Sequence, residues 1–80
     1  MYAVYVIKSQ NYKYTYTGFT NNLEKRLYEH NLGKTKSNKK YAPFIILYTE
    51  QVPDRTTARS RELFFKWWQG RKQLAQEHNT

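Results

Sequence analysis

Residues 2–8 read Tyr-Ala-Val-Tyr-Val-Ile-Lys, and residues 14–19 read Tyr-Thr-Tyr-Thr-Gly-Phe. Both stretches are rich in β-branched and aromatic residues and contain no proline, which is typical of β-strands. The polar residues between them, 9–13, include Asn11 and predict a hairpin loop. Because so short a connection joins antiparallel neighbours, the two strands are predicted to pair side by side.

A helix is predicted directly after the hairpin, over residues 22–32. Residues 20–22, Thr-Asn-Asn, offer caps for its first turn, and Asn21 precedes Glu24 by three residues, as in a capping box. Two leucines at i, i+4 spacing supply an apolar stripe. Gly33 is expected to end this helix.

The second half of the chain predicts one more strand and further helix. Residues 34–41 read as a basic loop, and the apolar run 44–49 reads as a third strand. A second helix is predicted over residues 58–69, ending at Gly70, with residues 71–77 as a short third helix. The sequence therefore predicts an α+β fold, in which a small three-stranded antiparallel sheet is flanked by two to three helices.

The length and charge of the chain restrict its class and its partners. Its 80 residues suffice for a single domain, residues 1–80. Lys and Arg number 14 against 6 Asp and Glu, a formal charge of +8, and the pI is about 9.8. Such an excess attracts polyanions, of which nucleic acid is the commonest. On charge alone, the alternative is a basic domain without such a partner.

Several functional classes are disfavoured by what the sequence lacks. It has no cysteine, hence no disulfide framework and no thiolate metal site, which suits a reducing cytoplasm. No apolar run approaches the roughly 20 residues that span a bilayer, and the first residues do not resemble a signal peptide. We therefore expect a cytoplasmic protein that does not bind a membrane.

A few residue pairs could carry chemistry. Tyr5 and Tyr16 lie on the two strands of the predicted hairpin, and Arg26 and His30 share one face of the first helix at i, i+4 spacing. Glu62 stands directly before the apolar run Leu-Phe-Phe. The usual catalytic sets are otherwise missing, since the acids are scattered and no glycine-rich phosphate loop is present.

Each of these residues also has a simpler interpretation. From pattern alone, the two tyrosines are more often packing residues of the sheet. Arg26 is more often a solvated helix charge, and His30 could be a surface cation near a helix C-terminus. Glu62 could pair with Lys66 at i, i+4, a contact that contributes only about 0.3–0.5 kcal/mol when exposed.

Taken together and in this order, the residues resemble the GIY-YIG nuclease superfamily, most of all its short, single-domain bacterial branch. Residues 3–5, Ala-Val-Tyr, take the place of the first family triplet, and residues 16–18, Tyr-Thr-Gly, that of the second. Residues 60–62, Ser-Arg-Glu, fall where the family has the helix with its metal-binding glutamate. The resemblance extends from residue 2 to about residue 74.

This resemblance implies a divalent-metal-dependent endonuclease that hydrolyses DNA phosphodiester bonds. Tyr5 and Tyr16 would orient the water nucleophile, one of them removing its proton, while Arg26 would clamp the scissile phosphate. A tyrosine with a pKa near 10 is a poor base, so Arg26 and the metal are expected to lower it. The family pattern also implies that His30 contributes to the site, that Glu62 anchors Mg²⁺ or Mn²⁺, and that Gly18 permits close packing.

Two departures from the family pattern keep an alternative open. Ala3 replaces the first signature glycine, and Phe19 stands where some relatives carry a lysine. The alternative is a catalytically weak or inactive nucleic-acid-binding module of the same fold. A third interpretation is an interaction domain whose Trp67-Trp68 surface docks a partner, and a homodimer through the same region is a related alternative.

The basic loop is predicted to contact the phosphates of DNA. Such contacts give salt-sensitive affinity without sequence information. The simpler interpretation is a solvated loop. The lysines concerned are Lys34, Lys36, Lys39 and Lys40.

Overall fold

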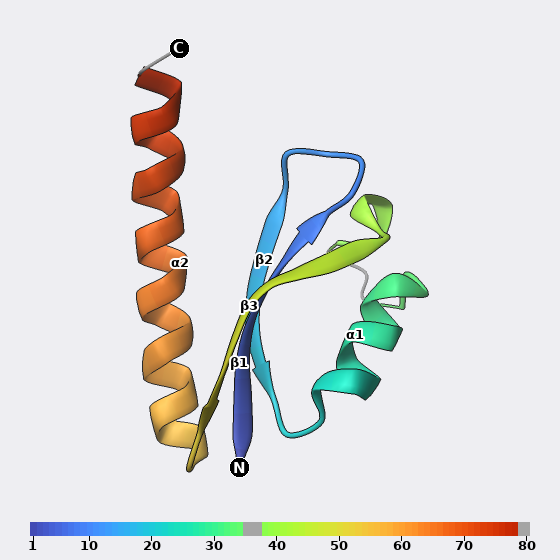
Figure 1. Ribbon diagram of the computed structural model, residues 1–80, viewed down its shortest axis with the longest axis vertical. Helices are drawn as coiled ribbons and strands as arrows, with labels where there is room; N and C mark the ends of the chain where they lie inside the picture. The colour runs from blue at the N-terminus through green and yellow to red at the C-terminus, as the bar shows by residue number, and fades with distance from the viewer. Residues whose placement is uncertain (35–37, 79–80) are drawn as a thin grey trace.

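The computed structural model describes residues 1–34 and 38–78, and the side chains of these as far as Trp67. A three-stranded sheet lies between two helices, α1 on one face and α2 on the other (Figure 1). The predicted α+β class, with a three-stranded antiparallel sheet and two flanking helices, is confirmed. The elements in order are β1 (Tyr2–Ser9), β2 (Thr15–Thr20), α1 (Leu23–Asn31), the 3-10 turn η1 (Lys39–Tyr41), β3 (Phe44–Val52) and α2 (Arg55–His78).

The strand order is β2-β1-β3, so the first strand lies in the centre, antiparallel to both neighbours. In the hairpin, Tyr5 is paired with Gly18 and Ile7 with Tyr16. Because side chains alternate between the faces of a strand, these residues share one face of the sheet. The pairing of β1 with β3 shifts register between Val6 and Ile7, which marks a bulge.

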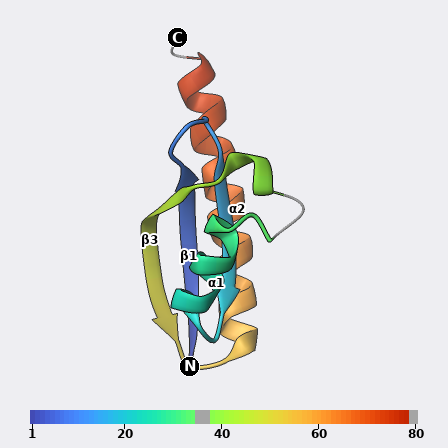
Figure 2. The ribbon, with the colours of Figure 1, turned by 90° about the vertical axis from the view of Figure 1, so that its right-hand side faces the viewer.

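The central strand is buried on both faces because a helix covers each of them. Figure 2 shows α1 in front of the sheet and α2 behind it. A strand covered on both faces carries a nearly continuous apolar run, which explains the unbroken apolar stretch of residues 3–7. The buried cluster under α2 contains Val4, Val52 and Ala58, and the cluster under α1 contains Tyr5, Ile7 and Phe44.

The first helix begins at Leu23, and its cap is Asn22. The side chain of Asn22 accepts a hydrogen bond of 3.2 Å from the backbone N–H of Lys25. The prediction that Asn21 caps the helix was therefore wrong by one residue. The cap satisfies one of the donors left open in the first helical turn.

The same helix ends where Gly33 was predicted to stop it. Gly33 has φ +75°, a left-handed conformation that glycine adopts without a β-carbon penalty. Its N–H donates to the carbonyl of His30, and the N–H of Lys34 donates to the carbonyl of Glu29, both at 3.1 Å. This paired closure turns the chain back toward the helix, so that the residues before β3 return to its face.

The second helix is one continuous element, and its first turn is capped by Asp54, whose carboxylate accepts from the N–H of Thr57 at 2.7 Å. The predicted stop at Gly70 and the separate helix over residues 71–77 were wrong. A glycine within a helix costs only about 1 kcal/mol, and it ends a helix only where the chain also adopts the left-handed closure seen at Gly33. None of the described helices is long and apolar enough to cross a membrane.

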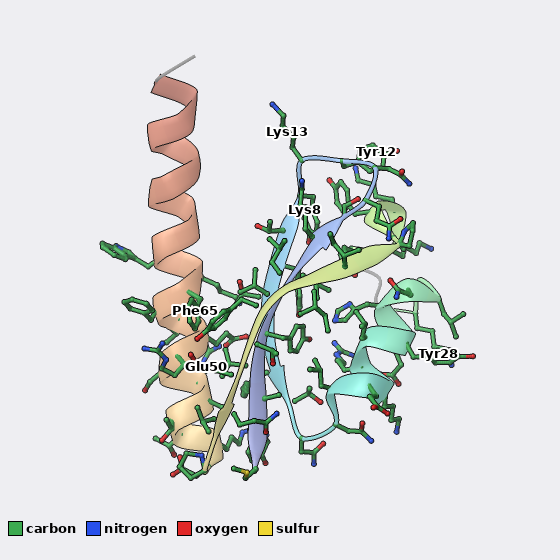
Figure 3. The ribbon with its side chains drawn as sticks, viewed as in Figure 1. Lys8, Tyr12, Lys13, Tyr28, Glu50 and Phe65 are labelled. Atoms are coloured by element: carbon green, nitrogen blue, oxygen red, sulfur yellow. The ribbon has the colours of Figure 1, made fainter. Side chains whose placement is uncertain are left out.

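A charged and aromatic clamp fixes α2 against β3. The guanidinium of Arg61 donates two hydrogen bonds to Glu50, at 2.6 and 3.1 Å, and the hydroxyl of Tyr48 donates to the same carboxylate at 2.8 Å. The ring of Phe65 packs against Tyr48 at 5.2 Å. Figure 3 shows Phe65 and Glu50 between helix and strand. Since Glu62 follows Arg61, the clamp also sets the position of Glu62.

Candidate active site

Three rings meet on the face of the sheet that α1 covers. The hydroxyl oxygen of Tyr5 lies 3.0 Å from Nε2 of His30. The ring of Tyr16 lies 5.0 Å from the His30 ring and 6.3 Å from the Tyr5 ring, measured between centroids. Tyr5 and His30 are buried, and Tyr16 is half-buried. The register of the hairpin and the position of His30 on α1 thus bring three of the predicted site residues together.

Gly18 lies in close contact with the two tyrosines of this group. A β-carbon added to Gly18 would lie 2.7 Å from the Tyr5 hydroxyl oxygen and 3.1 Å from Cε1 of Tyr16. Carbon atoms do not approach so closely without displacement of one partner. The absent side chain therefore leaves room for the hydroxyl end of Tyr5, a close packing of the kind that the family resemblance implied for Gly18.

Arg26 lies at the open side of the ring group. Its side chain is partly exposed and forms an ion pair of 3.4 Å with Glu29. Burial lowers the pKa of Arg26, but hydrogen bonding and electrostatic attraction to Tyr5, together with hydrogen bonding to Glu29 and Tyr16, outweigh this effect and raise the pKa above the ordinary value. The guanidinium is therefore a permanent positive charge next to the Tyr5 hydroxyl and accessible from solvent.

Burial raises the pKa of Tyr5 to about 12, although hydrogen bonding to Arg26 acts in the opposite direction. Arg26 lowers the pKa of Tyr5, as expected, but desolvation of the phenolate is the larger effect, so Arg26 alone does not bring it below its ordinary value. Burial, reinforced by the positive charge of Arg26, lowers the pKa of His30. At neutral pH, therefore, Tyr5 keeps its proton and His30 is an uncharged imidazole.

Asn38 holds the other side of the His30 ring. Its Nδ2 lies 3.4 Å from Nδ1 of His30, and both residues are fully buried. Within the described part of the chain, Oδ1 of Asn38 has no hydrogen-bond partner. Sequence reasoning missed this residue because an asparagine in a polar, lysine-rich loop gives no sign of burial. The closure at Gly33, which was predicted, is the local signal that the chain returns to the helix.

Glu62 lies on α2, the helix on the side of the sheet opposite α1 (Figure 1). It is 7% exposed and forms ion pairs with Arg59 at 2.5 Å and with Lys66 at 3.6 Å. The simple i, i+4 interpretation with Lys66 is thus present in the structure. The charge of Glu62 contributes to the raised pKa of Tyr5, so its carboxylate is within electrostatic reach of that hydroxyl without belonging to the ring group.

The donor set around Glu62 suits one kind of metal site. No group of three or more His, Cys, Asp or Glu side chains that could hold a metal occurs among the described residues. Mg²⁺ keeps several waters and binds through one or two carboxylates plus substrate phosphates. The ammonium of Lys66 and the guanidinium of Arg59 belong to exposed side chains that can move aside. Glu62 therefore suits a metal ion whose other ligands are water and the substrate phosphate, and does not suit one bound by protein side chains alone.

Three of the four predicted lysines are exposed near η1. Lys34 follows Gly33 at the C-terminal closure of α1, and Lys39 and Lys40 lie in the 3-10 turn that precedes β3. Lys36 lies outside the described residues. Their contact with nucleic acid stays a prediction, which their exposure permits.

Comparisons with known proteins identify a matching family model and similar sequences. A family model described as the GIY-YIG catalytic domain matches residues 1–75. A UPF0213 protein of Clostridium perfringens is 39% identical over 67 residues, which cover 82% of this chain and 71% of that protein. A UPF0213 protein of Staphylococcus haemolyticus is 33% identical over 72 residues, which cover 89% and 87%. No solved structure gave a significant match.

Proposed function

The chain belongs to the GIY-YIG family, and on that premise we propose that it is a divalent-metal-dependent endonuclease that hydrolyses phosphodiester bonds of DNA. The observation that supports this most is one convergence: two tyrosines, a neutral histidine and an arginine meet on one face of the sheet, at a glycine that makes room for them. These residues are Tyr5, Tyr16, His30, Arg26 and Gly18.

Arg26 is the phosphate clamp in this proposal. A guanidinium offers a planar fork of donors that matches phosphate oxygens. Arg26 is partly exposed, and its ion pair with Glu29 is long, at 3.4 Å. A phosphate can therefore compete with Glu29 for the guanidinium. Charge that develops on the phosphoryl oxygens during attack would be stabilised by this fixed cation.

Tyr5 positions the attacking water and, with His30, provides a route for its proton. With a pKa of about 12, Tyr5 is protonated at neutral pH and cannot act as a free phenolate. The neutral imidazole of His30 lies 3.0 Å from the Tyr5 oxygen. As the water loses its proton to Tyr5, the Tyr5 proton can pass to Nε2 of His30. This step requires the tautomer with its proton on Nδ1, and hence the amide of Asn38 turned so that Oδ1, which has no partner among the described residues, accepts from Nδ1. Tyr16, which borders both rings, orients the water from the other side.

Glu62 is the residue that would hold the metal. When bound, Mg²⁺ or Mn²⁺ supplies charge neutralisation at the phosphate and polarises the oxygens bound to it. Glu62 is the acidic residue whose charge influences the pKa of Tyr5, which supports a role at the same reaction centre.

A nucleic-acid-binding module without catalysis is the second candidate. The pairing of Glu62 with Arg59 and Lys66 favours it, since these cations already neutralise the carboxylate that a metal would need. The high pKa of Tyr5 points the same way. The net charge of +8 supports DNA as the partner in both cases.

A cleavage assay separates the two candidates. Plasmid, branched and single-stranded DNA would be incubated with the protein in Mg²⁺ or Mn²⁺, with EDTA as the metal-free control. Glu62→Gln removes the carboxylate charge, and Glu24→Gln on the exposed side of α1 is the matched control. Cleavage that EDTA blocks and that only Glu62→Gln abolishes supports the nuclease. Salt-dependent binding without cleavage of any substrate supports the binding module.

A further inference from the structure

Three tyrosines form a second aromatic group, the tyrosine cluster, beside the ring group of the site. The rings of Tyr14 and Tyr41 stack almost parallel, with centroids 3.9 Å apart and planes inclined by 7°. Tyr12 contacts Tyr41 edge-on at 5.5 Å. Tyr12 is 55% exposed, whereas its two partners are half-buried. The cluster therefore presents one ring, held from one side, to solvent.

The cluster joins the hairpin loop to η1. Tyr12 lies in the loop, at the end of the hairpin where Figure 3 labels it together with Lys13. From the cluster a continuous path of rings leads to the site, since Tyr14 lies 6.3 Å from Phe44 and Phe44 lies 5.8 Å from His30. Both groups therefore lie on the face of the sheet that α1 covers, with the buried rings of Phe44 and His30 between them.

The surroundings of the cluster are uniformly basic. Lys13, Lys39 and Lys40 are exposed, and the ammonium of Lys40 lies 5.0 Å from the centre of the Tyr41 ring. No Asp or Glu occurs in residues 1–23 or 30–49, which include both segments of the cluster. An exposed ring on segments that carry lysines and no acidic residue is complementary to a ligand that combines flat bases with phosphates.

We propose that the tyrosine cluster is a stacking subsite for an unpaired base of a nucleic-acid strand, with Tyr12 as the stacking ring and the neighbouring lysines on its phosphates. Stacking of bases on aromatic side chains in a basic groove is how proteins hold single strands without reading sequence. Base pairs inside a duplex leave no free base face for such a contact. The proposal rests on nucleic acid being the ligand, as in the proposed function.

The subsite defines a substrate class for that function. A strand that is clamped at Arg26 and stacked on Tyr12 is single-stranded near the reacting phosphate. Tailed or branched DNA is therefore the preferred substrate over a fully paired duplex. Tyr14 and Tyr41 already join the hairpin to η1 through their own stack, so the exposed ring of Tyr12 is not needed for that purpose.

Binding in EDTA tests the subsite without any turnover. The probes are a duplex with a single-stranded tail that carries 2-aminopurine and the same duplex with blunt ends, followed by anisotropy and by 2-aminopurine emission. Tyr12→Leu keeps an apolar side chain without a ring, and Tyr12→Trp restores a larger ring. Tyr28→Leu replaces a tyrosine on α1 that is also exposed (63%) and serves as the matched control.

We expect Tyr12→Leu to weaken binding of the tailed duplex about 5- to 100-fold, to leave the blunt duplex within about 2-fold, and to restore the quenched 2-aminopurine emission. Tyr12→Trp and Tyr28→Leu should behave like the parent. Equal losses on both probes, or no loss on the tailed probe, would overturn the subsite. Because no cleavage is involved, the subsite can stand if the nuclease proposal fails, and the reverse also holds.

Discussion

Tyr5 and Gly18 are cross-strand partners, and the hydroxyl end of the Tyr5 ring lies over the space that a side chain at position 18 would fill. Gly18→Ala is expected to displace Tyr5 from His30, because the added carbon would lie 2.7 Å from the hydroxyl oxygen. Overpacking of this kind costs about 1–3 kcal/mol of stability. Thermal unfolding together with DNA cleavage measures both effects, and cleavage should fall further than the loss of stability explains.

Gly33→Ala is the control for this substitution. It places a β-carbon at φ +75° and should cost about 1 kcal/mol, but it touches neither Tyr5 nor Tyr16. If Gly33→Ala reduced cleavage as strongly as Gly18→Ala, the loss would reflect general stability and not the position of Tyr5.

Burial of an uncharged His30 makes the stability of the fold depend on pH. Its pKa is lowered from the ordinary 6.5, so the unfolded chain binds the proton more readily than the folded one. The contribution of neutral His30 to the free energy of unfolding is therefore present above pH 6.5, and it is lost as the pH falls through the lower pKa of the folded state. Urea unfolding between pH 7.5 and 5 should show a decline that His30→Gln diminishes. An unchanged slope in that variant would mean that His30 is not the group responsible.

Asn38 should control the protonation of His30. Asn38→Asp places a carboxylate next to the imidazole, which favours the charged ring and raises the pKa of His30. As the pH is lowered, cleavage by this variant should therefore be lost at a higher pH than cleavage by the parent. Asn38→Ala removes the contact without adding charge and should lower the rate without raising that pKa. NMR titration of the His30 ring protons reads the pKa directly. The same pKa in both variants would contradict a role through Nδ1.

The homodimer predicted through Trp67 and Trp68 stays a prediction. Leu63, Phe64 and Trp67 are about half exposed or more on α2, and the side chain of Trp68 lies outside the described ones. We expect sedimentation velocity to show concentration-dependent dimers, which Trp67→Lys should convert to monomers by placing a charge in the apolar contact. If the parent protein stayed monomeric at all concentrations, the predicted dimer interface would be ruled out.

The sequence predicted the elements that depend on local chemistry. The hairpin follows from strand-forming residues on both sides of a polar turn, and its register then places Tyr5 near Tyr16. Gly33 and Gly70 look alike as helix stops, but only Gly33 has the paired hydrogen bonds that close a helix. Local patterns do not reveal whether such closure forms, since it depends on where the next segment packs.

The parts of the site that depend on tertiary packing were not predictable in the same way. The burial of Asn38 requires the loop to return to α1, and the raised pKa of Tyr5 results from burial by several elements at once. Glu62 was singled out because it precedes an apolar run and because of the family pattern, but its position on α2 is held by the clamp between α2 and β3. The cytoplasmic location predicted from composition is not tested by the fold.

The proposal that this ring group cleaves DNA is tested most directly by Arg26 and its neighbour. Single-turnover cleavage of tailed DNA in Mg²⁺ would be compared for the parent, Arg26→Ala and Lys25→Ala, which removes an adjacent exposed cation from the same helix. If Arg26 stabilises charge on the reacting phosphate, Arg26→Ala should slow cleavage about 10²- to 10³-fold, and Lys25→Ala should change it only slightly. Equal, small effects of the two variants would contradict the active site described around Tyr5.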